Sequence, residues 1–435
     1  MRRRIYETLL NWKKGNCEKP LIIIGSRQIG KTYIIEEFCK KEFRHFVEIN
    51  LKEDPRIGEI FKEKTSFQDK VEKMQIMITG KIDFASTILF FDEIQDSEEL
   101  ISSLKSFCEA DTKYNIICAG SLLGVKLHRF KSSFPVGKVE MVHMYPFDFE
   151  EFLWAMYGEL SDSVINMIRK CFENNSPMDE VLHNKLLEYY KLYLCVGGMP
   201  DSIANLIKGN QSILNYDESY LQGIVESYIN DMGQYVSNKQ EQVKIEQIYR
   251  SIPTQLGNVS NKFQYAKVAK SARSSTYELA LEWLLSSSMV YQCKLLKNVE
   301  IPPRAFLNDE YFKLYLNDVG LLRTLLNVQL GDIYLDNLYT YKGVIAENYV
   351  ACEFASHEYD LIYWKSKATA EVDFVLYNKD GLIPVEVKAA NHNRSKSLNE
   401  YMIKYSPKYG IRISSKNFGF EHQIKSVPLY AVFLI

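Results

Sequence analysis

Residues 21–38, LIIIGSRQIGKTYIIEEF, restrict the folds open to this chain more than any other stretch. An apolar run at 21–24 is followed by a loop and then by helix-forming residues; the loop reads Gly25-Ser26-Arg27-Gln28-Ile29-Gly30-Lys31-Thr32. This is the pattern G-x-x-x-x-G-K-[ST] between an expected strand and an expected helix, the setting that a phosphate-binding loop requires. Both glycines can adopt backbone angles that turn loop N–H groups inward, and the helix N-terminus adds positive charge. The stretch therefore predicts a site for the phosphates of a nucleotide.

Each part of this loop has an expected role. Lys31 would reach the β- and γ-phosphates, and the Thr32 hydroxyl would bind Mg²⁺. The other nucleotide contacts are predicted for the loop and the residue after it: Gly25, Ser26, Arg27, Gln28, Ile29, Gly30 and Tyr33. A chance match on an ordinary strand–turn–helix is the alternative, and it loses weight if another segment supplies a carboxylate for the metal.

Such a carboxylate follows the apolar run in TILFFDEIQ, residues 87–95. Asp92 ends an expected buried strand and would hold Mg²⁺, directly or through water. Glu93 is placed to orient or deprotonate the water that attacks the γ-phosphate. Ser121 ends another expected strand, NIICAGS, where it could sense the γ-phosphate, although Ala-Gly-Ser is also common at plain turns.

The first 150 residues read as one doubly wound α/β domain with a parallel sheet. After the loop, nearly continuous apolar runs recur between helical segments, at 44–51, 87–95, 115–121 and 139–147. Runs of this kind are typical of strands buried on both faces. Beside the expected nucleotide edge, a basic segment contains Arg129, Lys131 and Lys138. One of them could neutralise charge in the transition state, in this subunit or a neighbour, but a solvated basic loop explains them equally well.

Bulk properties exclude several classes of protein. A chain of 435 residues is expected to form two to four domains. Its net charge of −2 gives no global basic field, so any nucleic acid would be bound by a local patch. The 8 cysteines include no C-x-x-C pair, which disfavours zinc and disulfide frameworks. The N-terminus lacks the apolar core of a secretory signal, and no apolar run approaches the ~20 residues of a membrane span, so we expect a cytoplasmic protein without a membrane partner.

The middle of the chain reads mainly as helices. Residues 151–235 are predicted to form a helical lid, interrupted by GGMP at 197–200, where a helix stop is followed by a proline that starts the next helix. Residues 236–330 are expected to form two short helices, a turn and a third helix, then a β-hairpin of 304–309 and 312–318. This order is typical of a winged helix.

The third helix of this region has an expected apolar face and a basic start. The apolar face comprises Tyr277, Leu281, Leu284 and Leu285. The residues near the start that could contact DNA phosphates are Lys267, Lys270, Arg273 and Ser274. Winged helices also often serve only to pack against other domains, so the pattern leaves DNA contact and packing both open.

Residues 331–435 are expected to form a helix, two strands, a turn, a third strand and a helix. Side chains alternate along a strand, so Glu386 and Lys388 project from the same face. A two-residue turn at 380–381 would place Asp373 opposite Lys388, and a turn one residue earlier would place it opposite Glu386. In both registers the three share a face, where the two carboxylates could hold Mg²⁺, Lys388 could activate water, and Glu347 could join from the helix. The alternative is a charged, solvated face of an edge hairpin.

Taken together, these motifs resemble a known family over nearly the whole chain. GSRQIGKT, LFFDEIQ, AGSLLG and SFPVGKVEMVHMYPFDFEEFL are similar to the prokaryotic AAA-type ATPases that carry an uncharacterised, restriction-endonuclease-like C-terminal domain. The spacing D-x₁₂-E-x-K resembles the PD-(D/E)xK nucleases, with Glu347 as the helical acid. GGMP resembles the Gly-x-Pro motif of signal-transduction ATPases, which makes Pro200 a candidate adenine contact. Lys138 stands where many relatives have arginine, and lysine cannot form the same bidentate fork.

The resemblance implies ATP and Mg²⁺ as ligands and two functional hypotheses. In the first, an ATPase couples its nucleotide state to a C-terminal nuclease-like domain that cuts or binds nucleic acid, DNA rather than RNA. In the second, the protein is a nucleotide-gated scaffold whose C-terminal domain is inactive and binds nucleic acid or a protein partner. The chain could also form a homo-oligomer that completes the ATP site.

Overall fold

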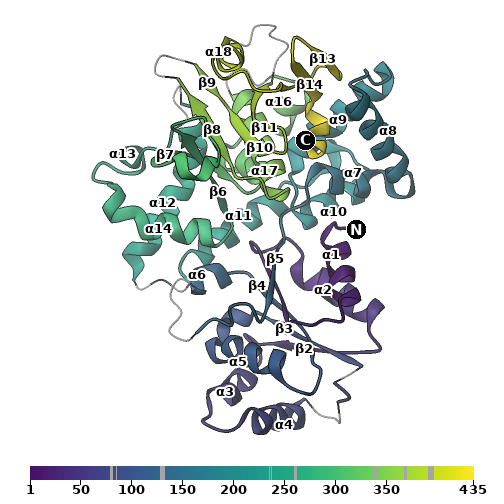
Figure 1. Cartoon of the computed structure of the whole chain (residues 1–435), viewed down its shortest axis with the longest axis vertical. Helices are drawn as coiled ribbons and strands as arrows, with labels where there is room; N and C mark the ends of the chain where they lie inside the picture. The colour runs from purple at the N-terminus through teal and green to yellow at the C-terminus, as the bar shows by residue number, and fades with distance from the viewer. Residues whose placement is uncertain are drawn as a thin grey trace. The chain divides into compact units, whose positions relative to one another are not determined.

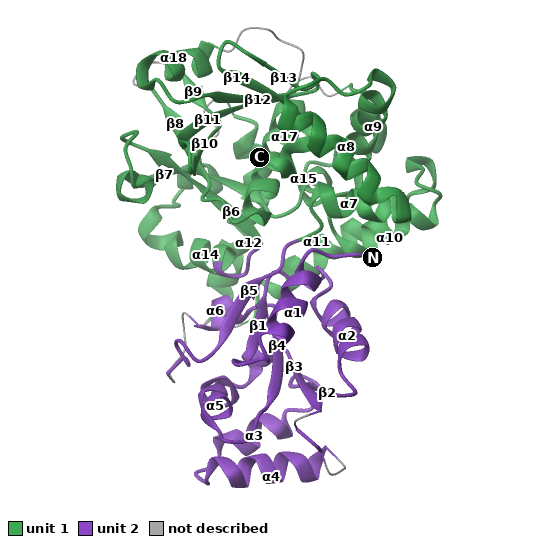
Figure 2. Cartoon of the chain, turned by 45° about the vertical axis from the view of Figure 1, so that its right-hand side comes forward, with its two compact units in different colours: residues 1, 146–285, 289–435 green, residues 2–145, 286–288 purple. Residues whose placement is uncertain are grey.

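The computed structural model describes residues 1–78, 82–84, 86–127, 133–234, 236, 238–258, 262–337, 341–366, 370–389 and 396–435. The chain divides into two compact units (Figure 2). The smaller unit comprises residues 2–145 and 286–288, and the larger comprises residue 1, 146–285 and 289–435. The regions predicted as lid, winged helix and nuclease-like domain lie in the larger unit apart from residues 286–288, and their separation into three domains stays a prediction.

The smaller unit is a parallel sheet with helices, the α/β fold of P-loop NTPases (Figure 1). Its elements are α1 (Ile5–Lys14), β1 (Leu21–Ile24), α2 (Lys31–Glu42), β2 (His45–Asn50), α3 (Arg56–Lys62), α4 (Phe67–Met77), β3 (Thr87–Asp92), α5 (Glu98–Glu109), β4 (Asn115–Gly120), α6 (Leu123–Leu127) and β5 (Glu140–His143). Every residue of β1, β3 and β4 is buried, as nearly continuous apolar runs predict.

The strand order of this sheet places the sequence motifs at one edge. The order is β2-β3-β4-β1-β5 and all pairings are parallel. Strand β4 therefore lies between β1, which leads into the glycine loop, and β3, which ends in Asp92. Because the strands are parallel, their carboxyl ends meet at the same edge, and Ser121 after β4 lies between the other two motifs.

The larger unit begins with helices. These are α7 (Phe149–Tyr157), α8 (Ser161–Asn174), α9 (Glu180–Val196), α10 (Pro200–Lys208), α11 (Ser219–Asp231), α12 (Lys239–Leu256), α13 (Tyr265–Val268), α14 (Ser274–Ser286), α15 (Val319–Leu325), α16 (Leu330–Tyr334), α17 (Tyr341–Ser356) and α18 (Lys396–Tyr405). None of the helices in the described parts of the chain combines the length and the apolar character needed to cross a membrane.

The strands of the larger unit form two sheets. The strands are β6 (Val290–Leu296), β7 (Leu307–Leu316), β8 (Ile362–Lys365), β9 (Glu371–Val372), β10 (Phe374–Asn378), β11 (Gly381–Lys388), β12 (Gly410–Ser414), β13 (Gly419–Glu421) and β14 (Ile424–Pro428). One sheet has the order β7-β6-β8-β9 and the other β10-β11-β12-β14-β13. Strand β6 pairs antiparallel with β7 and parallel with β8, so strands from the middle and the C-terminal part of the chain share a sheet.

The middle region contains a hairpin, but the two strands predicted for it are wrong. Residues 307–316 form the single strand β7, and its partner is β6, which is not one of the two predicted strands. The helix ends at Ser286, and Ser288 adopts a left-handed backbone angle, φ 57°. A run of three serines with little helix propensity separates helix from strand here, and tertiary pairing of β6 with β8 stabilises the extended conformation.

The C-terminal hairpin has the second of the two predicted registers. Phe374 pairs with Val385 and Asn378 with Gly381, so residues 379–380 form the turn. One step beyond the paired strand, Asp373 lies on the level of Glu386. The parallel pairing of β11 with β12 and of β12 with β14 extends this sheet beyond the strands that the motifs predicted.

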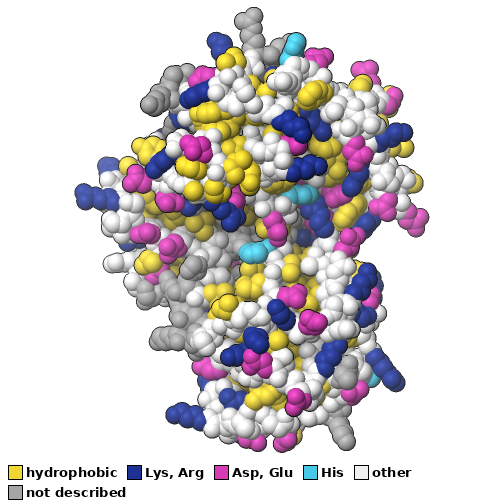
Figure 3. Space-filling view, in the orientation of Figure 1, with side chains coloured by type: hydrophobic (Ala, Val, Ile, Leu, Met, Phe, Trp, Pro, Cys, Tyr) yellow, Lys and Arg dark blue, Asp and Glu magenta, His cyan; other side chains and the backbone are white. Residues whose placement is uncertain are grey.

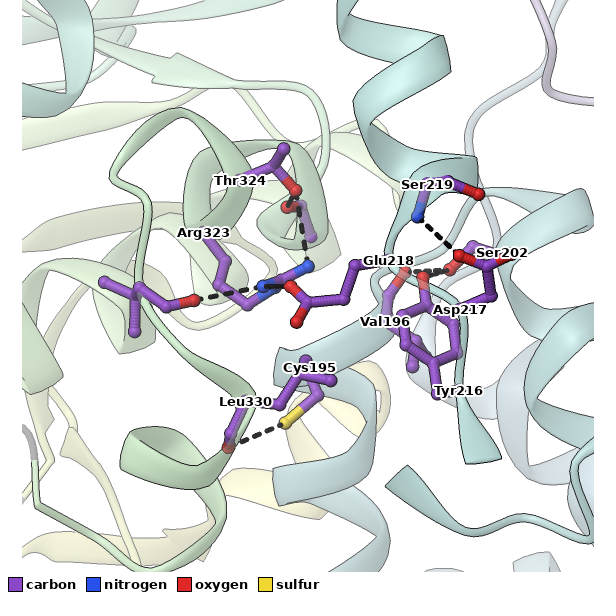
Figure 4. A network of polar contacts seen from close by, with 12 residues as sticks. Cys195, Val196, Ser202, Tyr216, Asp217, Glu218, Ser219, Arg323, Thr324 and Leu330 are labelled. Carbon is purple, nitrogen blue, oxygen red and sulfur yellow. Dashed lines mark hydrogen bonds and ion pairs between the residues drawn. The ribbon is translucent and has the colours of Figure 1, made fainter. Parts of the chain in front are cut away.

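A polar network ties several helices of the larger unit together (Figure 4). Arg323 of α15 is only 2% exposed, and its Nη1 lies 2.6 Å from Glu218 Oε2 at the start of α11. The same nitrogen donates to the Val328 carbonyl oxygen at 3.0 Å. Nearby, the Ser202 hydroxyl of α10 donates to the Val196 carbonyl oxygen of α9 at 2.6 Å. Buried hydrogen bonds with defined geometry favour one arrangement of the packed helices over other arrangements.

Candidate functional site

The glycine loop of the smaller unit has the backbone that its sequence predicts. Gly25 and Gly30 have φ angles of +152° and +87°, and Gln28 has φ +61°. A Cβ atom at Gly25 would lie 2.2 Å from the Met144 carbonyl oxygen. Glycine is therefore required at this position by both conformation and space.

Arg3 binds the backbone of the glycine loop, a contact that the sequence did not predict. Its side chain is 6% exposed. Nη1 donates to the Ile29 carbonyl oxygen at 2.8 Å, and Nη2 donates to the Tyr145 carbonyl oxygen at 2.6 Å. The buried guanidinium thus joins the loop to the segment after β5. Only the basic run at the N-terminus hints at such a residue, and a basic run usually indicates solvent exposure.

Lys31 is buried at the end of the loop. Its Nζ donates to the carbonyl oxygens of Gly25 at 2.9 Å and Ser26 at 2.7 Å. Burial lowers the pKa of this amine to about 8, against the attraction of the Glu93 and Asp92 carboxylates. The amine therefore lies where the loop folds around an anion, and phosphate oxygens could replace these carbonyl contacts.

Thr32 and Asp92 lie together, as the predicted metal site requires. The Thr32 hydroxyl donates to Asp92 Oδ2 at 3.0 Å. Asp92 also accepts from the backbone N–H of Glu93 at 3.0 Å through Oδ1. Burial, and then the neighbouring Glu93 charge, raise the pKa of Asp92. A hydroxyl and a carboxylate at this distance are oxygen ligands of the kind Mg²⁺ takes, so the residues fit this ion.

Glu93, Ser121 and Arg27 form a chain of hydrogen bonds. The Ser121 hydroxyl donates to Glu93 Oε2 at 3.1 Å and accepts from Arg27 Nε at 3.2 Å. The side chain of Gln95 also donates to Glu93 Oε2. Two donors therefore orient the carboxylate that the sequence predicted as catalytic. Gln95, which is 1% exposed, was not predicted, although its position two residues after Glu93 was visible in the motif.

The contacts described above do not include the other residues predicted for the ATP site. Tyr33 is on the first turn of α2 with 65% of its surface exposed. Lys138 forms an ion pair with Glu109 at 2.8 Å on the surface of the smaller unit. Arg129 and Lys131 lie outside the described residues. Pro200 is the first residue of α10 in the larger unit, and its contact with adenine stays a prediction.

The two glycines before Pro200 serve close packing. Gly198 donates its backbone N–H to Asp318 Oδ2 at 2.5 Å, and a Cβ at Gly197 would lie 2.3 Å from Asp318 Oδ1. Asp318 in turn accepts from the Leu321 N–H at the start of α15 at 2.9 Å. Burial raises the pKa of Asp318 to about 6, against these amide contacts. The GGMP sequence is thus explained as a tight turn between helices.

In the C-terminal region the predicted residues also come together. Lys388 Nζ lies 3.0 Å from Glu386 Oε1, and the Val387 N–H donates to Asp373 Oδ2 at 2.7 Å. Burial, followed by the Glu347 charge, raises the pKa of Asp373 to about 7. Glu347 therefore lies near this face, as the predicted helical acid should.

Three residues that sequence reasoning missed complete this cluster. Lys313 Nζ lies 2.9 Å from Glu347 Oε1 and 2.7 Å from Glu371 Oε1, and the Tyr315 hydroxyl donates to Glu347 Oε1 at 2.5 Å. Burial alone would lower the pKa of Lys313, but the surrounding carboxylates raise it well above its ordinary value. Across the described ranges, no three His, Cys, Asp or Glu side chains are arranged to share a metal ion.

The predicted DNA-contact residues are on the surface. Lys267, Lys270, Arg273 and Ser274 are all exposed near the start of α14. On the opposite side of that helix Tyr277, Leu281 and Leu284 are buried, as predicted, and Leu285 is half-buried. The basic side chains of α13 and of the segment before α14 are therefore exposed, while α14 buries its apolar face.

Three protein-family models match parts of the chain. Residues 17–153 match the family model of an AAA domain. Residues 187–331 and 342–432 match two domains of unknown function, DUF8612 and DUF4143. No curated protein matches the chain. The AAA match covers most of the smaller unit and indicates an AAA-type domain there, while the restriction-endonuclease-like assignment stays a prediction.

Solved structures give broader likenesses. A Walker-type ATPase of Pyrococcus abyssi is 16% identical, with a TM-score of 0.45 and coverage of 75% of this chain and 96% of that one. The Aeropyrum pernix ORC2 protein is 14% identical, with a TM-score of 0.39 and coverage of 77% and 92%. The Thermotoga maritima RuvB Holliday junction branch migration motor is 11% identical, with a TM-score of 0.30 and coverage of 67% and 89%. At these TM-scores we draw nothing further from the likenesses.

Proposed function

We propose that the protein hydrolyses ATP to ADP and phosphate in its smaller unit, with Mg²⁺ as cofactor. One observation carries this proposal: the carboxyl ends of β1, β4 and β3 bring the glycine loop, Ser121 and the Asp92-Glu93 pair to one edge of the sheet. Thr32 lies 3.0 Å from Asp92, and Ser121 lies 3.1 Å from Glu93. This arrangement supports phosphate binding, metal binding and activation of water within a single site.

Each residue then has one task. The loop N–H groups and Lys31 would hold the phosphates, and Thr32 and Asp92 would hold Mg²⁺, which neutralises charge on the phosphate oxygens when bound. Glu93 would take the proton from the attacking water. Ser121 and Gln95 would keep the Glu93 carboxylate in one orientation, because both donate to its Oε2. Arg27 would hold Ser121 in turn.

The first test is binding of Mg-ATP to a loop variant. Lys31→Ala is expected to weaken binding of Mg-ATP about 10–100-fold, because a charge-assisted hydrogen bond contributes roughly 1.5–3 kcal/mol. Titration calorimetry with purified protein measures the affinity. Lys40→Ala, an exposed lysine at the other end of the same helix that pairs with Glu36, is the matched control and should bind like wild type. Wild-type protein without affinity for Mg-ATP would overturn the proposal.

The larger unit would respond to the nucleotide and bind a macromolecule. We propose a helical lid at 151–235, a winged-helix-like region at 236–330 and a PD-(D/E)xK-like region at 331–435. The order α12, α13, α14 and then the β6–β7 hairpin supports the winged-helix reading. Of the two hypotheses for the C-terminal region, we propose the one in which it binds nucleic acid, DNA rather than RNA, without cutting it. A protein partner and a second copy of the chain are the alternative partners.

The winged-helix-like region would add its own contact with DNA through a local basic patch, defined here as Lys267, Lys270 and Arg273. On the face of the molecule drawn in Figure 3, basic and acidic side chains are interspersed, in keeping with a net charge of −2. A phosphate backbone would therefore be held by a few placed cations rather than by the field of the whole protein.

Replacing all three patch residues by alanine should weaken DNA binding and reduce its salt dependence. Each lost phosphate contact lowers the slope of log K against log salt by about 0.9, so the triple variant should lose about 2–3 in slope. Fluorescence anisotropy of labelled duplex DNA across a salt series measures this. The double variant Arg169→Ala/Lys170→Ala, on an exposed face of α8, is the control. Equal slopes in the wild type and the triple variant would remove the patch from DNA binding.

A further inference from the structure

We infer that Lys313 is a built-in cation that replaces the metal ion in the C-terminal carboxylate cluster, so that this cluster does not cut nucleic acid. The inference rests on the proposed PD-(D/E)xK-like reading of residues 331–435, which implies a metal held by Asp373 and Glu386 with help from Glu347. The described side chains do not fit that ion, and the reason lies in strand β7.

Lys313 is fully buried, with none of its surface exposed. Its ammonium group lies between two acids from different elements, 2.9 Å from Glu347 of α17 and 2.7 Å from Glu371 of β9. The Tyr363 ring centroid of β8 is 5.0 Å from the same nitrogen. Three elements of the C-terminal region therefore surround one cation that comes from the middle of the chain.

Each of the three acids that would hold a metal already accepts from a donor of the protein. Glu347 Oε1 accepts from both Lys313 and Tyr315. Asp373 Oδ2 accepts from the Val387 N–H, and Glu386 Oε1 accepts from Lys388. In the described part of the cluster, one buried oxygen, Glu386 Oε2, has no hydrogen-bond partner. Mg²⁺ needs several oxygen ligands in near-octahedral geometry, and it would have to compete with these donors for each of the three acids.

Charge gives the second reason. A lysine ammonium and a divalent cation that share Glu347 would repel each other strongly, because the interior screens charges far less than water does. Removing a buried ammonium from between its acids would in contrast leave uncompensated negative charge, which costs several kcal/mol. Lys313 and a metal are therefore alternatives at this place. The chain encodes the lysine.

The test is manganese binding without nucleotide, in an Asp92→Asn background that removes the proposed carboxylate ligand of the smaller unit. With Lys313 present, this protein should bind no Mn²⁺ in the larger unit, as followed by electron paramagnetic resonance. Adding Lys313→Met, which keeps the length and removes the charge, should create a Mn²⁺ site. Mn²⁺ should then raise the melting temperature of this variant alone.

Lys365→Met is the matched control. Lys365 contacts the other oxygen of the same acid, Glu371 Oε2, at 3.0 Å, but 40% of its side chain is exposed. Its removal leaves Lys313 in place, so no metal site should form. A folded Lys313→Met protein that binds no Mn²⁺ would overturn the inference, and so would Mn²⁺ binding to the Lys313-containing background that Glu386→Gln abolishes.

A second measurement applies whether or not Lys313→Met folds. Wild-type protein should cleave neither DNA nor RNA with Mg²⁺ or Mn²⁺, with or without ATP. Cleavage that disappears in Lys388→Ala would show that the cluster is a working nuclease and would overturn the inference. Both measurements are independent of ATP turnover, so a failure of the proposed ATPase activity would be recognised separately.

Discussion

Glu93→Gln is expected to lower steady-state ATP turnover by about 10²–10⁴-fold, the usual contribution of a general base. The amide keeps the size of the side chain and can still accept from Ser121, so the site should keep its shape. It cannot take a proton from water. Affinity for Mg-ATP should therefore stay close to that of wild type, because Lys31, Thr32 and Asp92 are untouched. Phosphate release and calorimetric titration measure the two quantities separately.

Glu99→Gln provides the control for this substitution. Glu99 is a half-buried acid on the first turn of α5, seven residues after Asp92. It is not part of the hydrogen-bond chain that joins Arg27, Ser121 and Glu93. Its replacement should leave turnover unchanged. Wild-type turnover in Glu93→Gln would show that another group activates the water and would remove Glu93 from the mechanism.

Arg323→Ala is expected to destabilise the larger unit by about 3 kcal/mol. Breaking a buried ion pair by removing one partner typically costs about 3–5 kcal/mol, and the half-exposed Glu218 can recover part of this from water. The truncation also leaves the Val328 carbonyl oxygen without this donor and opens space among α15, the start of α11 and the segment after α15. Chemical denaturation followed by far-UV circular dichroism measures the loss, with the transitions of the two units fitted separately.

Arg169→Ala tests whether burial causes the effect. Arg169 pairs with Glu150 at 3.8 Å, and half of its side chain is exposed. Exposed pairs contribute only about 0–1 kcal/mol, so this variant should unfold almost like wild type. If Arg323→Ala costs no more than Arg169→Ala, the network around Arg323 is not a main support of the helices.

The fold and the motifs of the smaller unit could be predicted because the information is local. A strand, a glycine loop and a helix follow one another in the sequence, and Asp92 and Ser121 each end an apolar run. Parallel strands place such ends at one edge in any strand order. The same reasoning could not identify Arg3 or Gln95, because their partners depend on which backbone and side-chain groups the folded loop brings within reach.

In the C-terminal region, the local sequence pattern predicts the hairpin but not the contacts between distant segments. Alternation along the strands narrowed the hairpin to two registers, and the turn at 379–380 selects one of them. Lys313 and Glu371 were not predicted, because their contact requires β6 to pair with β8 across a long stretch of chain. The same pairing explains why the strands of the middle hairpin were misplaced: residues 290–296 are extended through a partner that lies some seventy positions later in the sequence.

The strand β6 has a consequence for how this protein can be divided and inherited. The family match at 187–331 contains β6 and β7, and the match at 342–432 contains β8 and the acids around Lys313. Cutting the gene between the two matches would split one sheet. It would also separate the buried Lys313 ammonium from its two acidic partners. Neither half should be a free module that recombination can pass to other proteins, and the two should be found as a pair wherever this sheet is retained.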